Sequence, residues 1–340
     1  MTTAVILSNT PQPSFKVIGD LFAESLREAG VEVIERGVPS TSEERAALTK
    51  EFEGQETVFF HNVSMGKDFQ VIPEAKNVGL PAYEFSRVYD SAVRLLNKYD
   101  ELWVTTSYVG KLLKNSGVTV LILRLPPALD RQNFPKKTSY GPHKPFRFLF
   151  VGEPHFRKGV HFLMYGFVNA FPKTGEAELI IKTAINPRWA PLREDIKIIT
   201  EWLPTRDMQR LYAESDCYIS ASLAEGLGLP IAEAMLCGIP VCANNWGGHR
   251  DLLTEGGFFP LKFIEADRPW TGEPQFYTPG QKCAISNEVS VAEAMRQIVD
   301  SSPDTRQGMA AKARENLLQS YGTTALRSLW ATHVARLWKV

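Results

Sequence analysis

The sequence is poor in the cysteine patterns that build zinc sites, redox motifs and disulfide frameworks. It has four cysteines in 340 residues, and none of them has CxxC spacing. Cys217, Cys237 and Cys242 stand in strongly apolar segments, as buried free thiols usually do. We therefore interpret the four cysteines as reduced and structural, as in a cytoplasmic protein.

Long hydrophobic runs are also absent. No stretch approaches the ~18 consecutive apolar residues that a membrane-spanning helix needs. The opening residues MTTAVILSNT lack the basic region of a signal peptide, and their short apolar core is typical of a first β-strand. We expect a soluble, cytoplasmic protein.

Neither sign of charge is in excess. Lysine plus arginine and aspartate plus glutamate number 38 each, so the formal net charge is zero. A strong overall field that would attract nucleic acid or an anionic membrane is therefore not expected, although a local basic patch is compatible with this balance.

The first half alternates short apolar runs with helical patterns. Residues 15–29 have apolar residues at helical spacing, and Gly30 ends that helix. The expected strands are AVILS (4–8), VEVIE (31–35), TVFFHNV (57–63), ELWVTTS (101–107) and VTVLILRL (118–125). Strands separated by helices predict βαβ units and a parallel sheet.

A proline-rich stretch interrupts this pattern, and a second α/β series follows. PPALDRQNFPKKTSYGPHKP (126–145) holds five prolines and no periodic apolar face, which indicates a linker. The second series comprises strands at 146–152, 178–183, 195–200, 217–222 and 240–245 and helices at 159–171, 206–214 and 230–237. The last stretch, LRSLWATHVARLWKV, is an amphipathic helix with Leu326, Leu329, Trp330, Val334 and Leu337 on one side.

We thus expect an α/β protein with two Rossmann-like domains of similar size. The predicted boundaries are 1–135 for the N-terminal domain, 136–145 for the linker, 146–318 for the C-terminal domain and 319–340 for the final helix. Because ligands in such sheets bind beyond the carboxyl ends of the strands, we expect the active site in a cleft between the domains.

The segment AEGLGLPIAEAM (224–235) places two glutamates around a glycine-proline turn at the start of a helix. Pro230 suits the first helical position, and the free N–H groups of that turn with the helix dipole favour an anion such as phosphate. Gly226 and Gly228 allow a ligand to approach the backbone. Glu233, in the first turn, could accept hydrogen bonds from vicinal hydroxyls, and Glu225 would lie on the other side of the phosphate. The two carboxylates could bracket a sugar nucleotide; alternatively, both acids only favour a helix N-terminus.

A second element, FVGEPHFRKGV (150–160), supports the ligand interpretation. A strand ends at Gly152, and Arg157-Lys158-Gly159 opens the next predicted helix. Basic residues at a helix start are unfavourable against the dipole, and a bound diphosphate would remove that penalty. The alternative is a solvated Arg-Lys pair.

Together these motifs resemble the retaining GT-B glycosyltransferases of family GT4. Residues Glu225 to Glu233 are similar to their E-x7-E motif, and the resemblance is strong over about residues 146–255 and weaker over 80–135, where the chain resembles bacterial enzymes of polysaccharide assembly. It implies a GT-B fold, with two Rossmann-like domains facing each other across a cleft and the last helix packing back on the N-terminal domain.

The resemblance also implies residue roles. Glu233 would bind the nucleotide ribose, Glu225 the donor sugar and Lys158 the diphosphate, with Arg157 as a further charge. Gly226, Leu227 and Gly228 would supply loop contacts.

The chain departs from the family in its N-terminal half. NTPQPSF, with Ser14, stands where many relatives have a glycine-rich turn, and Glu153 stands where many have a basic residue. The histidine of many relatives is not evident near Tyr83, so Glu84 and Ser14 are the residues that we expect on the acceptor side. His61 is a further candidate, although a structural histidine is the simpler interpretation.

The resulting hypothesis is sugar transfer from a nucleotide-diphosphate sugar, most simply a UDP- or GDP-sugar, to an acceptor hydroxyl with retained configuration. No D-x-D triplet occurs in the chain, so we expect neither a metal-bridged donor nor a cofactor. The alternatives are a phosphorylase or epimerase of the same architecture, a sugar-nucleotide-binding protein without turnover, and transfer to modified DNA or protein. The acceptor is not indicated by the sequence.

Overall fold

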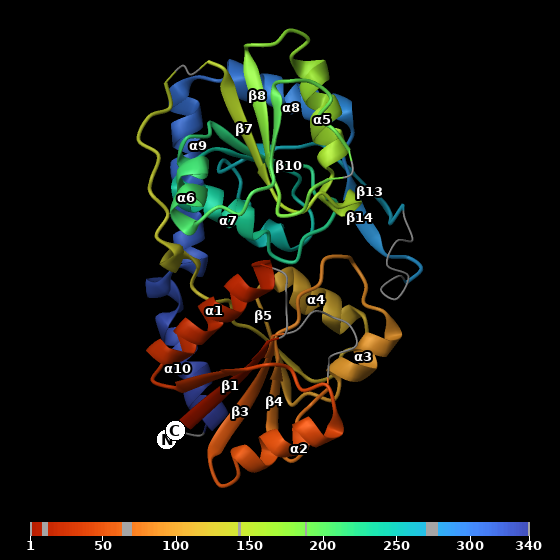
Figure 1. Cartoon of the computed structure of the whole chain (residues 1–340), viewed down its shortest axis with the longest axis vertical. Coiled ribbons are helices and arrows are strands. Elements are labelled where there is room, and N and C mark those ends of the chain that lie inside the picture. The colour runs from red at the N-terminus through yellow and green to blue at the C-terminus, as the bar shows by residue number, and fades with distance from the viewer. Residues whose placement is uncertain are drawn as a thin grey trace. The chain divides into compact units, whose positions relative to one another are not determined.

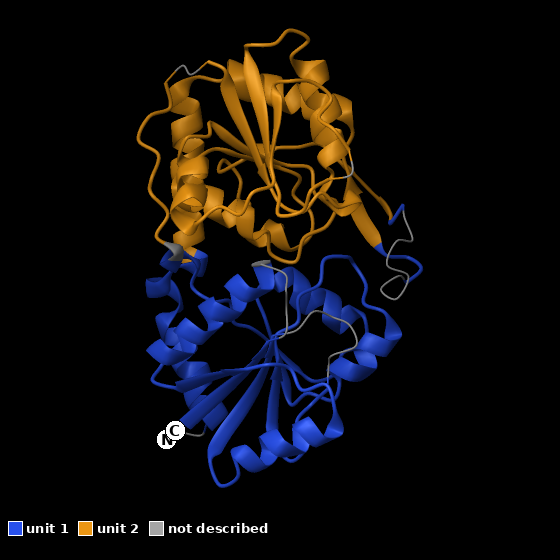
Figure 2. Ribbon diagram, in the orientation of Figure 1, with its two compact units in different colours: residues 1–131, 268–281, 320–340 blue, residues 132–267, 282–319 orange. Residues whose placement is uncertain are grey.

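The computed structural model describes residues 2–8, 13–62, 70–141, 144–187, 189–269 and 278–338. The chain divides into two compact units (Figure 2). Unit 1 comprises residues 1–131, 268–281 and 320–340, and unit 2 comprises residues 132–267 and 282–319. Both units are therefore assembled from segments that are distant in the sequence.

Unit 1 is built on a parallel sheet, six-stranded within the described residues, in the order β2-β1-β3-β4-β5-β6 (Figure 1). Its strands are β1 (Thr2–Ser8), β2 (Glu32–Arg36), β3 (Glu56–Asn62), β4 (Lys76–Gly79), β5 (Glu101–Val104) and β6 (Leu121–Arg124). Strand β4 was not predicted, because KNVG is too short and too polar to show an apolar run. Its neighbours define it instead: Val58 to His61 of β3 pair with Lys76 to Gly79.

The helices of unit 1 begin at local capping signals. They are α1 (Pro13–Glu28), α2 (Ser42–Glu51), α3 (Asp90–Leu96), α4 (Ser107–Asn115), the 3-10 turn η1 (Leu129–Gln132) and α10 (Thr323–Trp338). Helix α2 starts with a capping box, in which Thr41 and Glu44 satisfy each other's backbone N–H groups. Thr106 caps α4 by accepting a hydrogen bond from the N–H of Val109.

The last helix packs on the sheet of unit 1, as predicted. Leu326, Trp330, Val334 and Leu337 are buried in the same core as Phe22 of α1. The Trp330 indole meets Phe22 edge to face at 5.6 Å and donates a hydrogen bond to the carbonyl of Pro126 at 2.9 Å. The apolar stripe of α10 thus completes the core of the N-terminal sheet.

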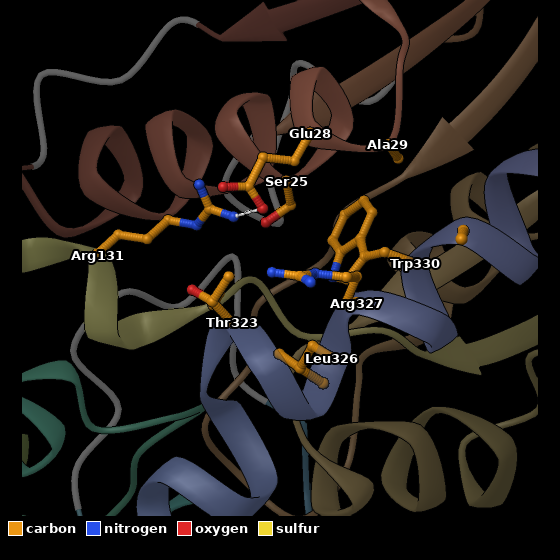
Figure 3. A pocket seen from close by; sticks show the side chains of 10 residues that line it. Ser25, Glu28, Ala29, Arg131, Thr323, Leu326, Arg327 and Trp330 are labelled. Atoms are coloured by element: carbon orange, nitrogen blue, oxygen red, sulfur yellow. Dashed lines mark ion pairs between the residues drawn. The ribbon is translucent and has the colours of Figure 1, made fainter.

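A small pocket of about 280 Å³ lies within unit 1 beside this helix (Figure 3). Its lining includes Leu326 and Trp330 of α10 and Ser25 of α1. Arg131 reaches across it and forms an ion pair with Glu28. The pocket contains none of the predicted site residues, and its polar lining serves to link α1, η1 and α10.

Unit 2 repeats the architecture. In the described residues its parallel sheet has the order β12-β11-β10-β7-β8-β9, and β13 pairs with β14 as an antiparallel ribbon. The strands are β7 (Phe146–Val151), β8 (Ala177–Lys182), β9 (Ile196–Ile199), β10 (Cys217–Ser220), β11 (Val241–Ala243), β12 (Phe259–Pro260), β13 (Ile264–Asp267) and β14 (Lys282–Ile285). All strands expected from the sequence in this half are present.

The helices of unit 2 are α5 (Val160–Ala170), α6 (Thr205–Ala213), α7 (Leu229–Cys237), α8 (Glu288–Asp300) and α9 (Pro303–Tyr321), with 3-10 turns η2 (Phe156–Lys158) and η3 (Gly248–Asp251). Helices α5 and α8 pack against each other and on one face of the sheet (Figure 1). The core there includes Phe148, Phe150, Leu163, Phe167 and Met295, all fully buried. Helices α6 and α7 also contact each other.

The segment that we expected to be a linker is docked on unit 2 where it is described. The backbone N–H of Lys137 donates to the carbonyl of Cys237 at 2.7 Å, and its ammonium donates to the carbonyl of Ser215 at 2.9 Å. The Tyr140 hydroxyl donates to the carbonyl of Gly238. The prolines keep this segment out of helix and sheet, and polar contacts anchor it.

Within the described residues, each helix is too short or too polar to cross a membrane.

Candidate active site

The sheet order of unit 2 locates a site before any side chain is considered. The chain runs from β7 outward to β8 and β9, and then returns to β10 on the other side of β7. The connections that follow β7 and β10 therefore lead toward opposite edges of the sheet, and open α/β sheets bind ligands beyond the carboxyl ends of two such strands. Arg157 and Lys158 follow β7, and Glu225 follows β10.

These three side chains form a largely buried ion cluster. The Lys158 ammonium lies 2.5 Å from Glu225 Oε1, and Arg157 Nη1 lies 3.5 Å from Glu225 Oε2. The same guanidinium nitrogen donates to the carbonyl of Ala224 at 2.7 Å. The Lys158 and Glu225 side chains are only 14% and 11% exposed, so water screens their attraction weakly.

Glu225 is ionised at neutral pH. Burial alone would raise the pKa of its carboxyl, but the positive charges of Lys158 and Arg157 outweigh burial and hold the pKa at about 2. A second carboxylate lies nearby: the hydrogen bond with His155 and the charges of Lys158 and Arg157 lower the pKa of Glu153. The cluster thus holds two largely buried cations, and side chains of this kind suit the binding of an anion.

The cluster corrects our expectation for the Arg-Lys pair. Both residues lie in the 3-10 turn η2, and α5 begins only at Val160, because Gly159 takes a left-handed conformation with φ of 64°. A Cβ on Gly159 would lie 2.1 Å from the carbonyl oxygen of Ala221, so glycine is required for the close approach of the two loops. The predicted penalty at a helix start does not apply, since Glu225 already compensates the charges.

Backbone contacts of two further glycines hold the Glu225 loop. Gly247 has φ of 79° and ψ of −155°, a region that is open almost exclusively to glycine. The N–H of Gly248 donates to the carbonyl of Glu225 at 2.6 Å. A Cβ on Gly248 would lie 1.8 Å from the carbonyl oxygen of Gly226. Residues 246–249, which follow β11, thus hold the Glu225 loop through close backbone contacts.

We expect Gly248→Ala to destabilise the protein by roughly 1 to 3 kcal/mol, the cost of overpacking, because the new methyl group must displace the backbone at Gly226. Urea denaturation measures the change. Gly308→Ala is the matched control, since Gly308 lies on the exposed side of α9 with open space around it and should gain helix stability. A Gly248→Ala variant as stable as wild type would contradict the role assigned to this glycine.

The helix that carries Glu233 starts slightly earlier than predicted. Helix α7 begins at Leu229, with Gly228 as its left-handed N-cap at φ of 88°, so Pro230 is the second helical residue. Glu233 is the fifth and lies in the second turn, whereas we had placed it in the first.

Glu233 makes a side-chain contact that the sequence did not predict. The hydroxyl of Tyr212 on α6 donates to Glu233 Oε2 at 2.6 Å. Tyr212 is fully buried, and Phe134 packs edge to face on its ring at 5.6 Å. Burial raises the pKa of Glu233 to about 7, and the hydrogen bond from Tyr212 partly opposes this rise. Near neutral pH, Glu233 therefore exists in both protonation states.

His249 and Asn244 are two further residues whose roles the sequence did not indicate. His249 Nε2 donates toward the carbonyl and side-chain oxygens of Asn244 at 2.6 and 3.1 Å, and the Asn244 amide donates to the carbonyl of Ser222 at 2.7 Å. Burial lowers the pKa of His249 to about 4, so the ring is neutral. The one sequence signal for this role is that His249 follows two glycines shortly after the apolar strand β11.

The remaining predicted residues divide between the units. Gly226, Leu227 and Gly228 lie in the loop between Glu225 and α7, so unit 2 brings together every residue predicted for the donor. Ser14 is exposed on α1 and Glu84 is partly buried before α3, both in unit 1. Residues 9–12 of NTPQPSF lie outside the described residues.

His61 is structural, as the simpler interpretation held. It is fully buried in β3, its Nε2 lies 2.8 Å from Asn77 Oδ1, and burial lowers its pKa to about 4. The neighbouring Tyr99 ring meets it edge to face at 5.0 Å. A neutral imidazole enclosed in this way supports the sheet.

Comparisons with known proteins bear on the fold and on unit 2. Residues 145–267 match the family model described as Glycosyl transferases group 1. A segment of 56 residues is 46% identical to the O-antigen chain mannosyltransferase B of Escherichia coli. That match spans 16% of this chain and 15% of the relative's length, so it concerns a small part of either protein.

Two solved structures share the architecture over nearly the whole chain. Anabaena HepE, in complex with UDP-glucose, has a TM-score of 0.70 at 15% identity and covers 98% of this chain and 99% of its own. Sucrose-phosphate synthase from Thermosynechococcus elongatus has a TM-score of 0.72 at 13% identity and covers 99% of each chain. The resemblance found in the sequence is confirmed: the chain has the GT-B fold of glycosyltransferases, and residues 145–267 match the glycosyltransferase group 1 family.

Proposed function

We propose that the protein transfers a sugar from a nucleotide-diphosphate sugar to an acceptor hydroxyl. The observation that carries this proposal is the cluster of Arg157, Lys158 and Glu225. It lies at the carboxyl ends of β7 and β10, between which the strand order of unit 2 reverses. It combines two largely buried basic side chains, both paired with Glu225, with the E-x7-E motif on a segment that matches a glycosyltransferase family. A phosphate group suits such a site, because hydrogen bonds from lysine and arginine to phosphate oxygens are stronger than those between neutral groups.

In the proposed reaction the bond between the anomeric carbon and the diphosphate oxygen breaks, and the acceptor oxygen forms the new glycosidic bond. The leaving diphosphate gains negative charge, and the proton of the acceptor hydroxyl passes to it. Lys158 and Arg157 would stabilise that charge, which is the electrostatic form of catalysis. Glu225 would orient the donor sugar and Glu233 the ribose. We propose attack on the face from which the diphosphate leaves, so the anomeric configuration is retained.

The donor class follows from the same residues and from the relatives. Glu233 suits the vicinal hydroxyls of a ribose, and the cationic cluster suits a diphosphate. The matching Anabaena structure holds UDP-glucose, and the matching Escherichia coli protein is named a mannosyltransferase. We therefore propose a UDP- or GDP-sugar as donor.

Thermal-shift titration with UDP-, GDP-, ADP- and TDP-sugars tests the donor, because a ligand that binds only the folded state raises the melting temperature. We expect one of these four classes of nucleotide sugar to raise the melting temperature clearly. We also expect the nucleoside diphosphate to be released when an acceptor mixture is added. Binding without release would identify a sugar-nucleotide-binding protein. Absence of any shift with all four donors would contradict the proposal.

We also propose that transfer needs no metal ion. The sequence contains no D-x-D triplet, and the described residues contain no group of three or more His, Cys, Asp or Glu side chains arranged to hold an ion. Turnover should therefore be unchanged in excess EDTA. Loss of activity with EDTA and its return with magnesium or manganese would show that this expectation is wrong.

A further inference from the structure

Lys182 is a buried lysine at the carboxyl edge of the sheet in unit 2, and the proposed reaction has not yet used it. It is the last residue of β8 and is only 6% exposed. Its ammonium donates one hydrogen bond, to the carbonyl of Thr183 at 2.9 Å, and makes no ion pair with any residue that the structure describes. Most buried lysines are paired with an acid, so this one is exceptional.

The side chain of Lys182 lies on the same face of the sheet as Glu233. Leu179 and Ile181 of β8 point into the core with α5 and α8, so the alternation of a strand places Lys182 on the opposite face. On β10, Ile219 belongs to that same core, and Tyr218 therefore lies on the face of Lys182. The Tyr218 ring stands 6.2 Å from the ring of Tyr212, whose hydroxyl binds Glu233.

Lys182 is also connected to the ion cluster through the backbone. It is the register partner of Val151 in β7, and the N–H of Gly152 donates to its carbonyl at 2.9 Å. A Cβ on Gly152 would lie 3.8 Å from the side chain of Lys158. The loop that carries Lys158 and the chain after Lys182 therefore leave neighbouring strand ends, and the Tyr218 hydroxyl lies 3.5 Å from the carbonyl of Val151 at the end of β7.

The charge of the donor favours a further cation at this site. Glu225 pairs with both Lys158 and Arg157, so part of their positive charge is already offset. The diphosphate of a nucleotide sugar carries a negative charge on each phosphate. Lys182 would supply a further positive charge.

The free-energy cost of burying the Lys182 ammonium also favours a bound anion. Burial lowers the pKa of Lys182, and the charge of Glu201 only partly opposes that effect. One carbonyl does not compensate an ammonium for the water that it has lost. An anion bound at the edge of the sheet would compensate the ammonium for this loss.

We infer that Lys182 binds the donor, and that its ammonium contacts phosphate oxygens of the nucleoside diphosphate. The inference rests on the proposed function, since it assigns a further residue to the same donor site. It makes donor binding depend on cations from two strand ends, with Arg157 and Lys158 after β7 and Lys182 at β8.

The experiment compares Lys182→Met with Lys173→Met. Methionine keeps the length of the buried side chain and removes its charge. Lys173 is exposed at the opposite end of β8, so its variant controls for the loss of one charge from unit 2. UDP, GDP, ADP and TDP are titrated into wild type by calorimetry, and the tightest of them is compared with its own nucleoside in both variants.

We expect Lys182→Met to weaken the nucleoside diphosphate about tenfold or more, the effect of a lost charge-assisted hydrogen bond, and to leave nucleoside binding unchanged. Its melting temperature should equal or exceed that of wild type, because an uncompensated buried charge has been removed. Lys173→Met should bind as wild type does.

Three results would overturn the inference while leaving the proposed function intact. They are unchanged diphosphate affinity in Lys182→Met, an equal loss for the nucleoside, and a lower melting temperature without loss of affinity. The last would identify Lys182 as structural. If wild type binds none of the four nucleotides, the proposed function fails and the inference fails with it.

Discussion

Replacing Lys158 by alanine should lower the turnover number by ~100-fold or more, the scale of a lost electrostatic donor in an active site. The ammonium would stabilise charge that grows on the departing diphosphate, so its contribution is larger in the transition state than in the ground state. Affinity for the intact donor should fall less. Steady-state kinetics with donor varied at saturating acceptor separates the two effects.

Two further variants sharpen this test. Lys158→Arg should not fully restore turnover, because a planar guanidinium does not replace a compact ammonium. Lys173→Ala, on the exposed surface of unit 2, should turn over as wild type does. Since Lys158 pairs with the buried Glu225, circular dichroism must first show that the alanine variant is folded. Wild-type turnover in both Lys158 variants would refute a catalytic role, and a raised KM with unchanged turnover would make Lys158 a binding residue only.

The second large effect concerns Glu233. If its carboxylate accepts both ribose hydroxyls, Glu233→Ala should weaken donor binding by roughly 1 to 3 kcal/mol. Alanine would also leave the buried hydroxyl of Tyr212 without its acceptor, so Glu233→Ala should lower stability as well. Glu233→Gln keeps that acceptor and removes only the charge, so it is the better variant for calorimetry. Unchanged nucleotide affinity in a folded Glu233→Gln protein would rule out the ribose role for the charged form.

The pKa of Glu233 also predicts a pH dependence. The pKa of this carboxyl is about 7 in the folded protein, because burial raises it, and near its ordinary value of 4.5 in the unfolded chain. Between these values the folded state holds more protons, so this group makes stability fall as pH rises from about 4.5 to 7. Donor affinity should rise over the upper part of the same range, because the ionised form is the better acceptor. Glu233→Gln should flatten both profiles.

Much of this fold could be predicted from the sequence because parallel strands flanked by helices have strong apolar patterns. The strand that was missed, β4, has four residues and derives its stability from pairing with β3 and β5. The stripe of Leu326 and Trp330 predicted correctly that the last helix would pack on the N-terminal sheet. Its partners, such as Phe22, are almost the whole chain away, and no local pattern identifies them.

The candidate site was predicted in its residues but not in its contacts. The motifs indicated Glu225, Glu233 and Lys158, while the ion pair between Lys158 and Glu225 depends on two loops that meet only in the folded sheet. At Gly159 the left-handed turn, which separates the basic residues from α5, passes so close to the carbonyl of Ala221 that a Cβ has no room there. Neither the ion pair nor the turn can be predicted from the spacing of residues along the chain.

The return of α10 to unit 1 has a consequence for biosynthesis. Residues 2–131 are made first, but Trp330 and Leu337, which close their core, are translated only after all of unit 2. Until then, the apolar face that includes Phe22 and Trp103 has no cover, whereas unit 2 has all of its residues by position 319. During synthesis the N-terminal half therefore exposes this apolar face until α10 has been made, and exposed apolar surface of this kind favours aggregation.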